Sequence, residues 1–176
     1  MPADFVPGPR NHIRDQRPHQ RRLGQDHGAT MSIELSSRLP DGLDGATLKH
    51  HVERKLRDEF AVLRIDWSDE HGEIDVASWS VRASVGAESD VLLLCVPPTY
   101  LHGERWLETS VVLRTPESKL LTLLIAASVA ELADAKVLDE AGWTGFGFAF
   151  GPRDVQAACT WSAPFSALAR ELFSGP

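Results

Sequence analysis

The sequence has few of the residues that build covalent cross-links. Only two of its 176 residues are cysteines, Cys95 and Cys159. Cys95 lies inside the apolar segment 91–96, where a thiol behaves as a small hydrophobic side chain. We therefore expect no framework of disulfides, and a reducing cytoplasm fits this cysteine content best.

Metal-binding motifs are also missing. Neither a His-Glu-x-x-His motif nor a pair of Cys-x-x-Cys units occurs in the sequence. His50 and Glu53 stand three residues apart on a predicted helix, but zinc usually needs three or four ligands. We expect no metal ion and no other cofactor.

No hydrophobic run is long enough to cross a membrane. The longest run, Leu120 to Ala133, is shorter than the roughly 20 residues that a transmembrane helix needs. The N-terminal residues carry positive charge, but no continuous apolar segment follows it, so the sequence shows no export signal. We expect a cytoplasmic protein that does not bind membranes.

Positive charge is scarce outside the N-terminus. Residues 1–30 contain five arginines and three aspartates, which leaves 13 basic and 22 acidic residues in the rest of the chain. Because nucleic acids attract clusters of Lys and Arg, we expect no nucleic-acid partner. An acidic domain favours a basic protein partner, or its charge serves only solubility.

Motifs of nucleophilic and nucleotide chemistry are absent as well. The sequence has no Gly-x-Ser-x-Gly element, and neither cysteine stands beside a histidine on a polar loop. The glycines of segment 142–151 do not complete a dinucleotide-binding pattern, which needs a glycine where Phe150 stands. We therefore expect a protein without catalytic activity, with an enzyme as the alternative.

Composition along the chain separates two regions. Pro, Arg, His, Gln and Gly dominate residues 1–30, and their apolar residues follow neither a helical nor a strand period. This pattern predicts a disordered basic extension. Regular patterning begins at Met31, and we expect residues 31–176 to form a single α+β domain.

Three helices are expected in this domain. Thr115 and Pro116 form a helix start, and the helix that follows, at about 116–133, is apolar around most of its circumference. It should be buried between the sheet and a second layer. Two amphipathic helices are predicted at 45–59 and 165–173. The second layer over the apolar helix is either the helix at 165–173 or a partner subunit in a homodimer.

Alternating apolar and polar residues predict strands in most of the remaining chain. The continuous apolar run 91–96 should form a central strand that is buried on both faces. In the strand at 63–67, Leu63, Ile65 and Trp67 should face the core. Hairpin-like turns between the segments indicate a mainly antiparallel sheet of about five to seven strands. The other predicted strands lie at 33–38, 74–85, 105–114, 136–139 and 144–151.

Two surface segments carry the candidate binding residues. The first is an acidic hairpin around His71, whose carboxylates are typical of solvated surface and also suit a basic partner. The second is the loop 97–106, which combines aromatic and charged residues as ligand pockets and protein interfaces do. The predicted partner-binding residues are Asp66, Asp69, Glu70, Glu73, Tyr100, His102, Glu104 and Trp106.

The predicted domain opens with the strand sequence IELSSRLP and an amphipathic helix, is acidic, and lacks catalytic motifs. In this layout it resembles the small immunity proteins with which bacteria neutralise toxins. The resemblance implies a non-catalytic interaction module whose acidic hairpin or aromatic loop covers a basic surface of its partner. The alternative is a small-molecule-binding domain or enzyme with a pocket closed by the loop 97–106.

Overall fold

The computed structural model of the protein describes residues 33–60, 62–69, 80–96, 103–159 and 163–174. The chain divides into two units, Met1–Thr30 and Met31–Pro176, and all described residues belong to the second unit. The predicted N-terminal extension lies outside the described residues. Within the second unit, the described residues form one antiparallel sheet of seven strands and four helices, which confirms the predicted α+β class.

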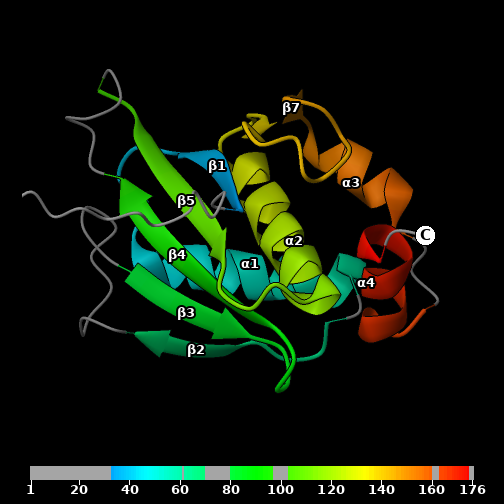
Figure 1. Ribbon diagram of the computed structural model, residues 1–176. Coiled ribbons are helices and arrows are strands. Elements are labelled where there is room, and N and C mark those ends of the chain that lie inside the picture. The colour runs from blue at the N-terminus through cyan, green and yellow to red at the C-terminus, as the bar shows by residue number, and fades with distance from the viewer. Residues whose placement is uncertain (1–32, 61, 70–79, 97–102, 160–162, 175–176) are drawn as a thin grey trace, which may run out of the picture. The chain divides into compact units, whose positions relative to one another are not determined.

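The sheet has the strand order β2-β3-β4-β5-β1-β6-β7. The first strand of the sequence is therefore an inner strand, and it pairs with β5 on one side and with β6 on the other. Figure 1 shows β1 beside β5. The strands are β1 (Glu34–Leu39), β2 (Asp66–Asp69), β3 (Ser80–Ser84), β4 (Asp90–Val96), β5 (Arg105–Val111), β6 (Val137–Leu138) and β7 (Ala149–Phe150).

Two of the helices begin at the side-chain caps that the sequence indicates. The carboxylate of Asp44 accepts a hydrogen bond from the backbone nitrogen of Thr47 at 2.8 Å. The hydroxyl of Thr115 accepts one from the backbone nitrogen of Ser118 at 3.2 Å. These bonds satisfy amide groups that lack a partner in the first turn of a helix. The helices are α1 (Gly45–Phe60), α2 (Pro116–Leu132), α3 (Pro152–Ala158) and α4 (Phe165–Phe173).

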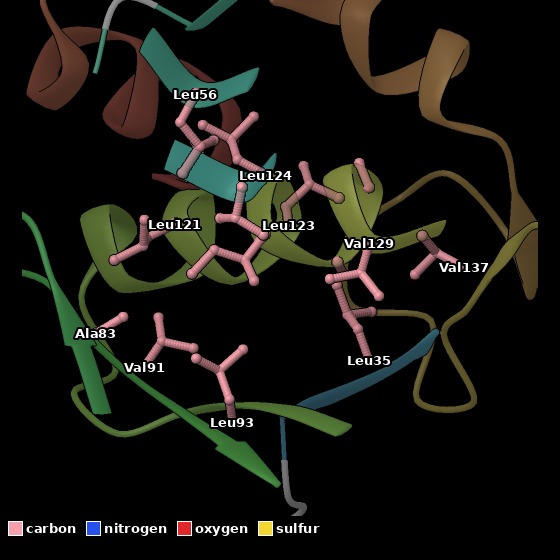
Figure 2. Close-up of a cluster of buried hydrophobic side chains, with 14 of the residues drawn as sticks. Leu35, Leu56, Ala83, Val91, Leu93, Leu121, Leu123, Leu124, Val129 and Val137 are labelled. Atoms are coloured by element: carbon pink, nitrogen blue, oxygen red, sulfur yellow. The ribbon is translucent and has the colours of Figure 1, made fainter. Parts of the chain in front are cut away.

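Helix α2 forms the centre of the hydrophobic core. Every residue from Leu120 to Ala130 is buried. One side of α2 lies on β1, β4 and β5, and other sides contact α1, α3 and α4. In Figure 2, Leu35 of β1 and Leu93 of β4 point from the sheet towards α2. The chain itself therefore supplies a second layer for this apolar helix, which consists of α4, one of the two expected alternatives, and of α1 and α3 in addition.

Buried hydroxyl groups on and next to α2 have partners within the core. The hydroxyl of Ser128 donates to the backbone oxygen of Leu124 at 2.7 Å. The hydroxyl of Ser37 on β1 donates to the backbone oxygen of Ala126 at 3.0 Å. A buried hydroxyl without a partner would cost about 1–3 kcal/mol, so these bonds make the polar residues compatible with the core. The Ser37 bond also fixes β1 to α2.

Three sequence-based expectations are wrong. The strand 91–96 is buried on one face only, since Leu94 is 43% exposed. Leu63 does not face the core but is 84% exposed, because β2 begins only at Asp66. Segment 144–151 is mostly a loop, because Gly145 and Gly147 adopt positive φ angles that interrupt a strand.

Helix α3 was not predicted, because its short sequence has no apolar stripe of helical period long enough to be recognised. Its start nevertheless has a simple physical basis. Pro152 occupies the first turn, and the carboxylate of Asp154 accepts a hydrogen bond from the backbone nitrogen of Gly151 at 2.7 Å. Val155 attaches the helix to the core and is fully buried.

Replacement of a core leucine on α2 should be far more costly than replacement of an exposed one. We expect Leu124→Ala to lower the free energy of unfolding by about 2–5 kcal/mol, because it leaves a cavity in a close-packed core. Leu63→Ala is the matched control and should change it by less than about 0.5 kcal/mol. Urea denaturation monitored by circular dichroism measures both, and equal effects would contradict the burial of α2.

Candidate protein-interaction face

The sheet has a second face, which none of the described helices covers. Neighbouring strand residues point to opposite faces, and Leu93 and Leu107 are buried beneath α2. Their neighbours therefore point away from the helices and are half-buried or exposed. We call this surface the open face. On β1, β3, β4 and β5 it comprises, by strand register, Glu34, Ser36, Arg38, Ser80, Arg82, Ser84, Asp90, Leu92, Leu94, Val96, Trp106, Glu108 and Ser110.

Apolar side chains form a continuous strip on the open face. Leu92, Leu94 and Val96 follow one another at every second position of β4. Val96 pairs with Trp106 of β5, which extends the strip onto the next strand. The solvent face of an antiparallel strand usually carries polar residues, so three aliphatic residues in sequence are unusual there. We call these four residues the apolar strip.

Carboxylates lie directly beside the apolar strip. Glu108 of β5 pairs with Leu94 on one side and with Ser36 of β1 on the other. Partial burial raises the pKa of the Glu108 carboxyl, and the negative charges of Glu34 and Glu140 raise it further. Glu108 is thus an acidic group placed where its charged form is disfavoured.

The arginines of the open face interact with carboxylates of the same chain. A guanidinium nitrogen of Arg38 lies 3.3 Å from the carboxylate of Glu104, and one of Arg82 lies 3.4 Å from that of Asp90. These side chains are partly or largely exposed to solvent, and such ion pairs add little to stability. They leave the open face with a polar and charged rim around an apolar centre, which is the usual anatomy of a protein interface.

A shallow cavity of about 280 Å³ adjoins the open face at its β2 end. Its charged lining groups are Asp66, Arg82 and Asp90. Asp66 is paired with Arg64, whose guanidinium lies 2.6 Å away, and Arg82 is paired with Asp90. The cavity thus extends the open face towards β2.

Three of the predicted partner-binding residues, Asp66, Glu104 and Trp106, lie on or beside the open face. Asp69 is described only through its backbone, which pairs with Val81 of β3. Parts of the acidic hairpin and of the aromatic loop lie outside the described residues. These parts include Glu70, Glu73, Tyr100 and His102.

Sequence reasoning missed Glu108 and the three aliphatic residues of the apolar strip. The run 91–96 has the composition of a strand buried on both faces, so Leu92 and Leu94 looked like core residues. The sequences of the flanking strands could have indicated that this side of the sheet faces solvent. Arg82 and Ser110, the register partners of Leu92, are polar, which places that side of the sheet towards solvent.

Several groups with reactive side chains have structural roles. Glu53 accepts a hydrogen bond from the indole nitrogen of Trp67 at 2.6 Å, which attaches α1 to the edge strand β2. Buried Asp139 accepts hydrogen bonds from the backbone nitrogen and the hydroxyl of Thr144, at 2.9 and 2.7 Å, and orders the loop before β7. Burial raises the pKa of the Cys159 thiol to about 11, so it is protonated and unreactive at neutral pH.

Among the described residues, no group of three or more His, Cys, Asp or Glu side chains could hold a metal ion. None of the helices in the described ranges has the length and apolarity that a membrane span requires. Comparison of the chain with protein-family models, with curated proteins and with solved structures found no match.

Removal of the Glu108 charge should stabilise the fold at neutral pH. The pKa of this carboxyl is higher in the folded state than in the unfolded state, where it is near 4.5. The free energy of unfolding therefore falls as the pH rises above about 4.5, and the loss is complete above the raised pKa. We expect Glu108→Gln to increase the free energy of unfolding at pH 7 by only about 0.5 kcal/mol, because solvent screens this half-buried carboxyl, with no gain at about pH 3.5.

Urea denaturation at both pH values measures this difference. Exposed Glu171 on α4 supplies the control, since Glu171→Gln removes the same charge away from the sheet and should change stability little at either pH. A loss of stability in Glu108→Gln at pH 7 would contradict the assignment.

Proposed function

We propose that this protein is a non-catalytic interaction module that binds a partner protein through the open face. The observation that carries the proposal is the apolar strip, an uninterrupted row of aliphatic side chains next to a tryptophan on a sheet face without a helical cover in the described chain. Tryptophan and desolvated aliphatic side chains are the residues that contribute most to protein interfaces. We therefore place the partner over Leu94 and Trp106.

The energetics of the open face support a binding role. Leu94 remains 43% exposed, and Glu108 carries a charge that its surroundings disfavour. Neither feature helps the isolated domain, for which polar uncharged residues would serve better at both positions. Residues that are unfavourable for the free fold are typical of sites retained for function.

The proposal includes the immunity-type role that the layout of the sequence suggests. Outside residues 1–30 the chain has 22 acidic against 13 basic residues, and an acidic protein associates fastest with a basic partner. A rigid sheet face also binds without a large ordering cost, because its strands hold the side chains in place. The module would act by covering the partner's functional surface.

A photo-crosslinker at position 94 tests this proposal. The full chain, with Leu94 replaced by benzoylphenylalanine, is irradiated in a lysate of the cells that make it. We expect a protein adduct, identified by mass spectrometry, that purified wild-type protein competes away and that a second variant with Trp106→Ala weakens at least tenfold, because Trp106 extends the contact.

The matched control places the same crosslinker at Leu63, which is equally aliphatic and 84% exposed but lies outside the sheet. It should give no such adduct. Equal adducts from both positions, or adducts at position 94 that wild-type protein does not compete away, would refute the open face as the binding surface.

A further inference from the structure

We draw no further inference here: the strongest candidate, the cavity of about 160 Å³ between α1, α2 and α3, points to no ligand, because Lys55 in its lining is paired with both of its carboxylates, Glu59 and Glu131.

Discussion

Helix α2 can be stable only when apolar surface is covered around most of its circumference, and the rest of the domain is arranged to satisfy this requirement. Burial of each leucine or valine contributes on the order of 1.5–3 kcal/mol, so a helix with every residue from Leu120 to Ala130 buried dominates the stability of the domain. The sheet covers one side, and α1, α3 and α4 cover others. Polar residues enter this core only where, like Ser37, they have a hydrogen-bond partner.

This arrangement places the described helices on one face of the sheet and leaves the other face without a cover from any of them. The same strand β4 contributes to both. Leu93 supports α2, while Leu92 and Leu94 form the apolar strip between polar neighbours. Glu108 lies on the same face, where partial burial and two neighbouring negative charges raise the pKa of its carboxyl. Buried core residues and residues of the open face thus alternate along the same strand.

Local sequence patterns were sufficient to predict those helices whose starts and apolar faces are set by neighbouring residues. Asp44 and Thr115 cap the helices that were predicted from them, and the apolar stripe of 165–173 forms α4. Patterns failed where the outcome depended on distant segments. The composition of 91–96 does not reveal how many of its faces are covered, and Gly145 and Gly147 turn a segment with strand-like alternation into a loop.

The sequence by itself determined the class of fold, the acidity of residues 31–176, and the need of the central helix for cover on more than one side, because hydrophobic period and charge are properties of neighbouring residues. Only the tertiary structure decided what supplies that cover and which surface remains open. It joined Leu94, Trp106 and Glu108 from two strands into one surface and placed Glu34 and Glu140 beside them. Strand register sets such neighbours, and register depends on the pairing of segments far apart in the chain.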